Sequence, residues 1–395
     1  MRLLSTGPAE VYRAIASMGR TEDVAWSPDG RRLALAAITL DRLLVVGVDC
    51  QTVEGRKTLV LTDAVEIASD SLQRPHGVSW IGNDRLAVAN REGIVSIFDV
   101  PAPDGLTSVH HLQAMAVISK RETELVSTPG SLCARDLGAG LVELWVCNGF
   151  SNYVTHHLLD LRAGLAHVDA QVFMQRGLDL PDGVAVDARG DWVAISNHDR
   201  HAVALYRNDE WLAADQAPVA QLEGVTYPHG LCFLADGRIL LVADAGAPHV
   251  AVFFRPAQGW VGGAAPDDVV RVLDDGAFQQ GHYNPREGGP KGIDAHEPWG
   301  VVVTTCAQQP LAFFDADPLV ARAQPAALGG HRPADPARIT VLRLARGVAA
   351  REAAVTAAVR KELEQMRSSW SWRVTAPLRA LAGRWMRRYA GRGKP

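Results

Sequence analysis

Short apolar runs separated by turns recur along most of the chain. One stretch reads "PHGLCFLADGRILLVADAGAPHVAVFF", from Pro228 to Phe254. In it an apolar run follows Pro-His-Gly, a turn at Asp-Gly leads to a second run that ends in Asp, and a third run alternates apolar and polar positions. Apolar runs of about four to eight residues bounded by Gly, Pro and Asp are typical of β-strands. The pattern therefore predicts β-sheet in this stretch.

Five further copies of the pattern are spread along the chain. They begin at Thr21, Arg74, Thr128, Leu180 and Gly289. The position after Pro falls at 76, 130, 182, 229 and 291, at intervals of 54, 52, 47 and 62 residues, and Glu22 lies another 54 residues upstream. Short strands in repeats of about 50 residues are typical of β-propeller blades. The sequence predicts an all-β, six-bladed β-propeller of four-stranded blades over residues 1–346, followed by a helical tail over residues 347–395.

The outer strands and the closure of the ring are the least regular parts of the pattern. "LTSVHHL", "PVAQLEG" and "VVRVLDD" are the expected fourth strands of the second, fourth and fifth blades. Two segments are candidates for the strand that closes the ring, residues 11–17 and residues 338–344. A closed ring leaves few exposed strand edges, which would otherwise invite aggregation.

The composition is globular, and its charge is uneven. Of 395 residues 47% are apolar, and the net charge is −4. Residues 367–395 hold seven Arg and one Lys with no acid, so the rest of the chain carries −12. An acidic body argues against broad nucleic-acid binding. Five dispersed cysteines without a Cys-x-x-Cys pair, and an N-terminus without a secretory apolar segment, predict reduced thiols and a cytoplasmic protein.

At Pro-x-Gly the repeats resemble those of NHL-repeat propellers and of the gluconolactonase/senescence-marker-protein family. In both, Pro-x-Gly starts the innermost strand of a blade and Val-x-Asp/Asn ends the second. "EDVAWSPDG", from Glu22, is similar to the first-blade Glu-Gly-Pro-x-Trp of the gluconolactonase family, with Asp-Val in place of Gly-Pro. The resemblance covers roughly residues 10–345 and implies the propeller architecture more strongly than any activity.

The innermost strands of a propeller line its central channel, and their first residues meet at one mouth. The residues expected there are Glu22, His76, Gly130, Asp182, His229 and Lys291. Blades one and four lie opposite each other, as do blades two and five. A second, wider circle at the ends of the second strands consists of Asn90, Asn148, Asn197, Asp244 and Thr305. Its side chains are expected either to bind a ligand, as Lys291 is, or to close turns.

Two imidazoles and two carboxylates on one axis predict a divalent metal site formed by Glu22, His76, Asp182 and His229. The nitrogen ligands favour zinc, whereas calcium prefers oxygen ligands. Gluconolactonase-type propellers hold their metal with carboxylate and amide groups, which Glu22 and Asp182 match in type. The two histidines are instead similar to those of the amidating-lyase propeller, which hold zinc. Two alternatives remain, a metal-free pocket for a small molecule and polar residues that only contact channel water.

Other polar positions near the channel are weighed in the same way. The long connection over residues 256–290 is either a cover for the mouth, since long loops are often functional, or a Gly- and Pro-rich surface insert. His198 and His201 lie in a turn and are expected to be solvated. Thr155, His156 and His157 are expected at the surface. No Gly-x-Ser-x-Gly elbow and no phosphate-binding loop occurs, so serine hydrolase and nucleotide chemistry have no support.

The tail predicts an attachment segment. Residues 348–369 are Ala-rich and helix-prone, and a second helix after Thr375 combines apolar positions with arginines and Trp385. Such a basic amphipathic helix binds a membrane surface, a partner, or the acidic body itself. "SWRVTAPLRAL", from Ser371, resembles a segment near the C-terminus of many bacterial glycosyltransferases and other proteins of cell-surface polysaccharide synthesis. This implies a bacterial context at the inner face of the membrane.

Two functions follow from these features. In the first, the channel mouth binds a saccharide or sugar lactone and, with a metal and the carboxylates of Glu22 and Asp182, acts as a lactonase, another hydrolase or a lyase. In the second, the propeller is a non-catalytic scaffold that brings polysaccharide-synthesis proteins together through its tail. The fold alone does not decide between them, because propellers host many functions.

Overall fold

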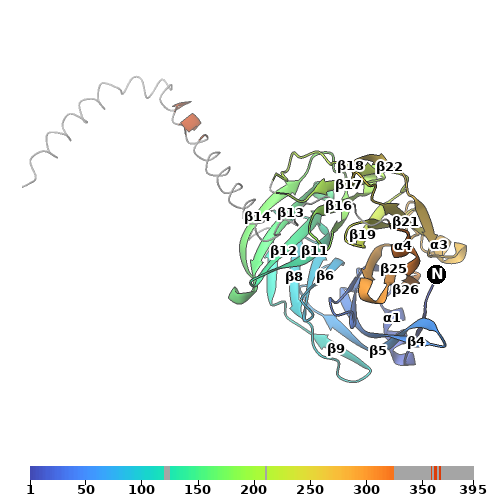
Figure 1. Ribbon diagram of the computed structural model, residues 1–395. Coiled ribbons are helices and arrows are strands. Elements are labelled where there is room, and N and C mark those ends of the chain that lie inside the picture. The colour runs from blue at the N-terminus through green and yellow to red at the C-terminus, as the bar shows by residue number, and fades with distance from the viewer. Residues whose placement is uncertain (120–124, 210, 324–356, 358–359, 363, 366–395) are drawn as a thin grey trace, which may run out of the picture. The chain divides into compact units, whose positions relative to one another are not determined.

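The computed structural model describes residues 1–119, 125–209, 211–323, 357, 360–362 and 364–365. Within these residues the strands form six sheets arranged in a ring (Figure 1). In each sheet the first strand in sequence lies innermost, apart from the short N-terminal strand β1 (Leu4–Thr6), which pairs at the outer edge of blade one. The predicted six-bladed propeller is confirmed.

Blades one and three have the longest strands. Blade one consists of β2 (Thr21–Trp26), β3 (Arg32–Ala37), β4 (Arg42–Val53) and β5 (Arg56–Ala68). Blade two consists of β6 (Pro75–Ile81), β7 (Arg85–Asn90), β8 (Ile94–Asp99) and β10 (Ala116–Ser119). Blade three consists of β11 (Pro129–Gly138), β12 (Leu141–Asn148), β13 (Tyr153–Asp160) and β14 (Ala166–Met174).

The other three blades complete the ring. Blade four consists of β15 (Pro181–Val186), β16 (Trp192–Asn197), β17 (Ala202–Arg207) and β18 (Ala220–Leu222), with β22 (Gly262–Ala264) added in parallel. Blade five consists of β19 (Pro228–Leu234), β20 (Ile239–Asp244), β21 (His249–Phe254) and β23 (Asp268–Arg271). Blade six consists, among the described residues, of β24 (Gly292–His296), β25 (Val301–Cys306) and β26 (Gln309–Asp315).

Apolar side chains fill the space between neighbouring blades. Six buried clusters each combine strands of two adjacent sheets, for example Leu86 and Val88 of blade two with Leu43 and Val45 of blade one. Another joins Val303 of blade six to blade one. Because both faces of each sheet pack against another sheet, the central strands are apolar at nearly every position rather than at alternate ones.

The glycine of Pro-x-Gly is required by the packing of the innermost strands. A Cβ on Gly77 would lie 2.6 Å from the Cα of Ser131 in the next blade, and a Cβ on Gly292 would lie 2.6 Å from the Cα of Asp23. A Cβ on Gly183 would collide with the carbonyl oxygen of His229. The motif therefore marks the places where neighbouring blades approach too closely for a side chain.

Hydrogen bonds between the innermost strands join the blades around the axis. Asp23 of β2 accepts a bond from the amide of Val78 in β6 at 2.9 Å. Asp294 of β24 accepts one from the amide of Trp26 at 2.7 Å. Ser79 Oγ of β6 accepts one from the amide of Ala134 in β11 at 3.0 Å. The inner edge of an innermost strand has no neighbouring strand, so its backbone amides lack a partner within the sheet. Side chains of the preceding blade accept these hydrogen bonds instead.

The ring closes differently from the prediction. Residues 11–17, predicted as a possible closing strand, lie in a helix, α1 (Ala9–Ser17), whose Val11 and Ile15 are buried. Leu3 instead donates an amide hydrogen bond to Phe313 in β26 at 2.8 Å, and Met1 accepts one from Asp315 at 2.9 Å. The extreme N-terminus thus pairs with blade six. The other candidate, residues 338–344, lies outside the described residues.

The predicted outer strand of blade two was wrong. "LTSVHHL" contains β9 (Thr107–His111), which pairs in parallel with β5 of blade one. The outer strand of blade two is β10, which pairs antiparallel with β8. Alternating polarity suits any edge strand, so the pattern did not reveal which sheet the segment joins. The expected outer strands of blades four and five are confirmed as β18 and β23.

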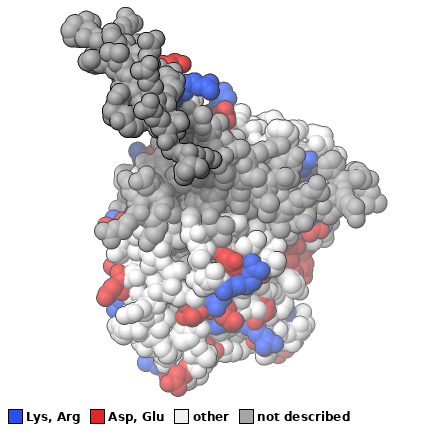
Figure 2. Space-filling model, turned by 90° about the vertical axis from the view of Figure 1, so that its left-hand side faces the viewer, with Lys and Arg blue, Asp and Glu red and all other residues white. Residues whose placement is uncertain are grey.

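The remaining features concern the surface and the tail. On the face shown in Figure 2, acidic and basic side chains lie next to one another on a largely uncharged surface. All five cysteines are free thiols, as expected. Among the described residues, none of the helices has both the length and the apolar character needed to cross a membrane. The six described residues beyond 323 are helical, while the predicted boundary at 346 and residues 367–395 lie outside the described part.

Candidate functional site

The first residues of the innermost strands converge at one mouth of the channel, as predicted. The rings of His76 and His229 stack with their centroids 5.2 Å apart. Glu22 Oε2 lies 3.6 Å from His76 Nε2 and 3.5 Å from His229 Nε2. Asp182 Oδ2 lies 3.2 Å from His229 Nε2. All four side chains are buried, and Glu22 is completely inaccessible. They form the axial cluster of the protein.

Glu22 is the least satisfied member of the axial cluster. Its Oε1 contacts Arg20 Nε. Its Oε2 has the two histidines at the distances above and Lys291 Nζ at 3.8 Å, but no hydrogen-bond partner among the described residues. A buried carboxylate oxygen without a close donor is costly. Three nitrogens thus surround this oxygen at a distance too long for a direct bond.

An arginine that the sequence did not point to completes the axial cluster. Arg91, in the turn between β7 and β8, places Nη2 2.5 Å from Asp182 Oδ1 and 3.0 Å from His76 Nε2. A guanidinium only donates, so His76 Nε2 accepts and its Nδ1 donates to the carbonyl of Gly130 at 2.6 Å. His76 is therefore the neutral tautomer with its lone pair on Nε2.

Gly130 explains why Arg91 reaches the axis. It occupies the blade-three position where other blades carry Glu, His, Asp or Lys. A Cβ at Gly130 would lie 2.8 Å from Arg91 Nη1, and a Cβ at Gly149 would lie equally close. Two glycines of blade three thus leave the space that a side chain from blade two fills. Gly130 was a sign in the sequence that one side chain of the predicted ring is missing. It did not show that Arg91 fills the space.

The long connection before blade six contacts residues beside the axial cluster. Glu287 Oε2 lies 2.7 Å from Lys291 Nζ, and its Oε1 lies 2.8 Å from His198 Nε2. The connection includes α3 (Asp275–Gln280) and bonds to Ala245 through the amides of Gly288 and Gly289. Of the two expected alternatives, the contacts of Glu287 favour a place at the mouth over a surface insert. The expected solvation of His198 was wrong, because this side chain is buried against Glu287.

Burial and charge set the ionisation of these groups. Burial and the charge of Arg91 lower the pKa of His76 to about 3. Burial likewise lowers the pKa of His229 to about 3, although Asp182 opposes it. Burial opposes ionisation of Asp182, but Arg91 and the neighbouring histidines outweigh it and lower the pKa of that carboxyl. At neutral pH the axial cluster therefore has two neutral imidazoles beside an ionised Asp182.

The side chains of the second circle form hydrogen bonds with backbone groups. Asn90 accepts a hydrogen bond from the amide of Gln73 at 2.9 Å, and Asn148 accepts one from that of Ser127 at 2.8 Å. Asn197 accepts one from the amide of Asp179, and Asp244 accepts bonds from the amides of Thr226 and Tyr227. Thr305 instead donates its hydroxyl to the carbonyl of Pro310. The three Asn residues and Asp244 fasten the segment that enters their own blade, whereas Thr305 bonds across the hairpin between β25 and β26 of blade six. A ligand-binding role for these residues stays a prediction.

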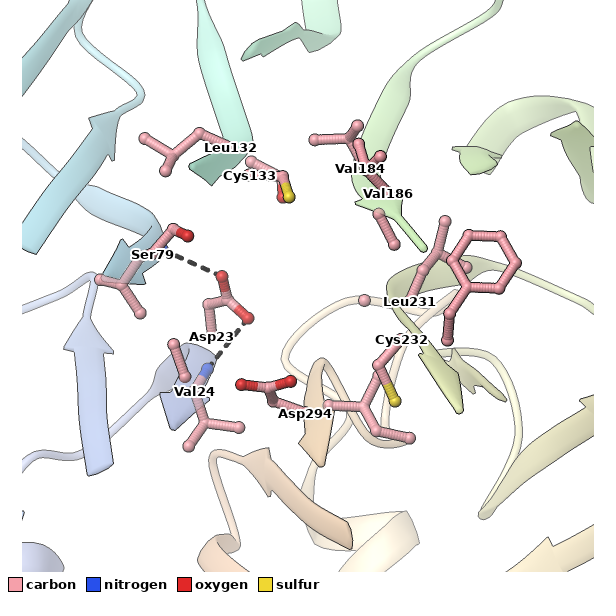
Figure 3. A pocket seen from close by; sticks show the side chains of 17 residues that line it. Asp23, Val24, Ser79, Leu132, Cys133, Val184, Val186, Leu231, Cys232 and Asp294 are labelled. Carbon is pink, nitrogen blue, oxygen red and sulfur yellow. Dashed lines mark hydrogen bonds between the residues drawn. The ribbon is translucent and has the colours of Figure 1, made fainter. Parts of the chain in front are cut away.

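Beyond the axial cluster the channel widens into a cavity of about 170 Å³ (Figure 3). Asp23 and Asp294 lie on one wall, and the rest is lined by Ser79, Ser131, Cys133, Cys232 and apolar side chains. Burial raises the pKa of Asp23 to about 8 in spite of its two backbone hydrogen bonds. Burial also raises the pKa of Asp294 to about 6. The described residues that line this cavity include no basic side chain.

Asp23 is expected to make the fold less stable as pH rises. Its pKa is near 3.8 when unfolded and about 8 when folded, so between these values the folded state binds the extra proton. The stabilisation is complete below pH 4 and is lost as pH rises through 8. Replacing Asp23 by Asn should flatten the pH dependence of the unfolding free energy between about pH 5 and 7 by on the order of 1 kcal/mol per pH unit.

Chemical unfolding at several pH values measures this slope. The exposed Asp104 provides the control, because Asp104→Asn should leave the slope unchanged. The Asn at position 23 also lowers stability at every pH, since its amide nitrogen cannot accept a backbone bond. The quantity to compare is therefore the slope of the unfolding free energy against pH. An unchanged slope in Asp23→Asn would contradict the raised pKa of Asp23.

The expectation for the blade-three histidines was wrong. Thr155, His156 and His157 in β13 are completely buried. His156 Nε2 lies 2.9 Å from Glu143 Oε2, and its ring packs against Trp145. His157 Nε2 bonds Thr155 Oγ1 at 2.9 Å. The third strands of these blades are covered on both faces by neighbouring sheets. Polar residues in them are therefore buried and hydrogen-bonded to one another rather than exposed.

The match of part of the chain to a family model supports the propeller architecture. Residues 6–138, roughly a third of the chain, match the family model of the lipoprotein LpqB beta-propeller domain. A search of curated proteins gave no match. A luciferin-regenerating enzyme aligns at 12% identity and a TM-score of 0.48, covering 76% of this chain and 92% of its own. The hydrazine synthase of Kuenenia stuttgartiensis aligns at 14% identity and a TM-score of 0.49, covering 82% of each chain.

The match to the family model concerns fold rather than activity. The chain is a β-propeller whose first third is similar to the LpqB domain. The identities to the two structures are too low to indicate a shared function. None of these matches supports the resemblance of the tail to polysaccharide-synthesis proteins, which stays a prediction.

Proposed function

We propose that the axial cluster binds a divalent transition metal, with zinc as the first candidate, and that the loaded protein hydrolyses a sugar lactone or a related ester. The observation that carries this proposal is the environment of Glu22 Oε2. Within the described part of the chain it is buried without a hydrogen-bond partner, and two neutral imidazoles face it at 3.5 and 3.6 Å. Glu22, His76 and His229 would be the protein ligands.

The donor set fits zinc in type and spacing. Two neutral imidazoles and one carboxylate, with a position left open, are a known ligand set of catalytic zinc. Bonds of about 2.0–2.1 Å at tetrahedral angles place ligand atoms about 3.3 Å apart, close to the two separations between Glu22 Oε2 and the histidines. In the structure the lone pair of His76 Nε2 accepts a hydrogen bond from Arg91 at 3.0 Å, so a metal bound there would replace Arg91, whose Nη2 also contacts Asp182.

Charges around the axial cluster define the roles of the other residues. Asp182, kept ionised by Arg91, is suited to hold a positive charge or accept a hydrogen bond from substrate rather than to take a proton. This narrows the catalytic role that the sequence predicts for Asp182. Lys291 is paired with Glu287 and can donate to an anionic group of the substrate. A bound metal would supply Lewis-acid polarisation of the ester carbonyl.

Metal analysis of the purified protein, followed by zinc titration against a chromophoric chelator, tests the proposal. We expect one zinc ion per chain and zinc-dependent hydrolysis of glucono-δ-lactone. A protein that binds no zinc, cobalt or manganese would refute the metal site. Metal binding without hydrolysis of any lactone or ester in a panel would refute the activity alone.

The scaffold function is the second candidate. It is favoured by the closure of the mouth, where only about 10 Å³ of free space lies between Arg20, Tyr283, Glu287 and Lys291. It is also favoured by the eight basic residues without an acid in residues 367–395. On this proposal the tail attaches the propeller to proteins of polysaccharide synthesis at a membrane.

Deleting residues 367–395 tests that attachment. The full chain should sediment with anionic vesicles at low salt, while the truncated protein should stay in the supernatant, because the deletion removes all eight basic residues of this segment. Replacing the seven arginines by Gln in the full chain separates charge from length. Equal sedimentation of full and truncated protein would contradict the membrane role.

A further inference from the structure

The strand β9 (Thr107–His111) leaves one edge of the first blade open. It pairs in parallel with β5 along residues 64–68, and the register between the two strands runs without a bulge. On its other side, no described strand follows in the sheet. Figure 1 shows β9 at the outer rim of the ring. The strand is therefore an edge that another chain can reach.

The hydrogen bonds to β5 determine which backbone groups of β9 face outward. Ala64 donates its amide to the carbonyl of Leu106 at 3.0 Å, and Leu112 donates its amide to the carbonyl of Ala68 at 2.9 Å. In a parallel pair, residues two apart along a strand bond the same neighbouring strand. The even-numbered residues from 106 to 112 therefore bond β5. The odd-numbered ones direct their N–H and C=O groups to the open side: Thr107, Val109 and His111.

The edge of β9 lacks the features that usually prevent pairing. Strand edges are commonly protected by charged side chains, prolines, bulges or short length. β9 reads Thr-Ser-Val-His-His, without Lys, Arg, Asp, Glu or Pro. The outer strand β23 instead carries Asp268 and Arg271, which both form ion pairs. The edge of β26 is occupied by the N-terminus, where Arg2 bridges to Phe314. The edge of β9 is thus open to pairing where these two are not.

The side chains of β9 are also accessible. Val109 at its centre is 60% exposed, and Leu106, which precedes the strand, is 49% exposed. Thr107 and His111 are exposed on the same face as Val109, because side chains alternate along a strand. A groove of about 370 Å³ lies between this face and α1. The helix therefore leaves β9 uncovered.

From these features we infer that two copies of the chain pair through β9 to form a two-fold symmetric dimer. In an antiparallel pairing centred on Val109, the two Val109 residues lie opposite each other, and Thr107 lies opposite His111 of the second copy. Residues that face each other in this way exchange two N–H···O bonds per pair, about six bonds in all. The first blades of the two copies then form one continuous sheet. The pairing does not involve the axial cluster and is independent of the proposed function.

The order of side chains favours a second copy over an unrelated strand. From Leu106 to Leu112 the sequence is Leu-Thr-Ser-Val-His-His-Leu, which has the same order of apolar and polar residues in both directions. In the pairing centred on Val109, Leu106 lies opposite Leu112, and Ser108 lies opposite His110. Each facing pair is then apolar on both sides or can hydrogen-bond on both sides, and no like charges meet. A two-fold axis is also the commonest symmetry of protein dimers.

Sedimentation velocity of the full chain over a range of concentrations tests the inference. The strand pair alone is smaller than a standard interface, which buries about 1,200–2,000 Å². We therefore expect a weak dimer with a Kd on the order of 10–100 µM. The average mass should rise from that of one chain to that of two as the concentration passes through this range. A protein that stays monomeric throughout would overturn the inference.

Charge substitutions at Val109 test the position of the two-fold axis. Val109→Lys places two like charges opposite each other and should weaken the dimer about 5-fold or more. Val109→Glu should have the same effect. An equimolar mixture of the two variants should form a heterodimer, because opposite charges then face each other. A mixture that pairs no better than either variant alone would overturn the pairing centred on Val109.

Val109→Pro tests the backbone bonds separately from the side chains. The amide of Val109 points outward, so proline is tolerated there without the loss of a bond to β5. The substitution removes both bonds that the two Val109 residues exchange and should weaken the dimer about 10-fold or more. A dimer as tight as that of the unchanged chain would show that another surface forms it.

Val269→Lys is the matched control. Val269 is 53% exposed in the edge strand β23 of blade five, so the substitution adds the same charge at another sheet edge. It should leave the dimer unchanged, and a loss equal to that of Val109→Lys would contradict a role specific to β9. Thermal unfolding of each variant checks that the fold is intact, because substitutions at exposed positions usually cost little stability.

Discussion

Replacing Gly183 by Ala is expected to destabilise the propeller by about 3 kcal/mol or more, at the upper end of the cost of overpacking. A Cβ at this position collides with the carbonyl oxygen of His229 in the next blade. The obstacle is backbone, which cannot rotate away as a side chain can. Blades four and five would have to separate where the innermost strands are closest. Equilibrium unfolding in denaturant measures the loss.

Gly263→Ala is the control for this prediction. Gly263 lies in β22 at the outer edge of blade four, and the nearest atom to a methyl group added there is the carbonyl oxygen of Gln221 at 3.9 Å. That distance is an ordinary contact, so the substitution should change stability by less than about 0.5 kcal/mol. Similar losses for both variants would show that the glycine of Pro-x-Gly is not set by contact between blades.

Replacing either axial histidine by Ala is expected to lower the zinc affinity strongly. His76→Ala or His229→Ala leaves two protein ligands out of three, and the zinc affinity should fall by on the order of 100-fold or more, since even the loss of a partner of a ligand costs about 10–100-fold. The Nε2 atoms of both rings face Glu22 Oε2, so neither is replaceable from elsewhere in the cluster. Competition with a chromophoric chelator measures the affinity.

His111→Ala provides the control for the axial histidines. His111 is an exposed residue of β9 on the edge of blade one, far along the fold from the axis. Its removal should leave the zinc affinity unchanged. Glu22→Gln keeps the shape of the buried side chain and removes its charge, so it should also weaken zinc binding. Wild-type affinity in all three axial variants would contradict the assignment of the ligands.

The architecture was predictable because a propeller repeats its physical requirements. Each blade needs a glycine where innermost strands approach and apolar residues on both faces of its central strands. These requirements produced six similar stretches of sequence, and the shared register placed Glu22, His76, Asp182 and His229 at one mouth. The irregular parts did not repeat and were predicted less well. The edge strand β9 joined blade one, and the segment at residues 11–17 formed a helix.

The axial cluster was predictable only in part. Arg91 and Glu287 reach it from a turn of blade two and from the connection before blade six, so neither shares the register of the repeats. Gly130 marked a missing side chain but carried no information about what fills the space. The hydrogen-bond partners of the second circle were also not predictable. Most of them are backbone amides in the segments between blades, and these segments do not follow the repeat.

By itself the sequence determined the number of blades, the place of the inner strands and the four residues that meet on the axis, because all of these follow from local patterns that recur at a nearly constant interval. Only the tertiary structure decided the ionisation of those residues and the balance of charge around them. Ionisation depends on burial and on neighbours distant in the chain. His76 and His229 are neutral because they are enclosed, and Asp182 is charged because Arg91 reaches it through the space that two glycines leave.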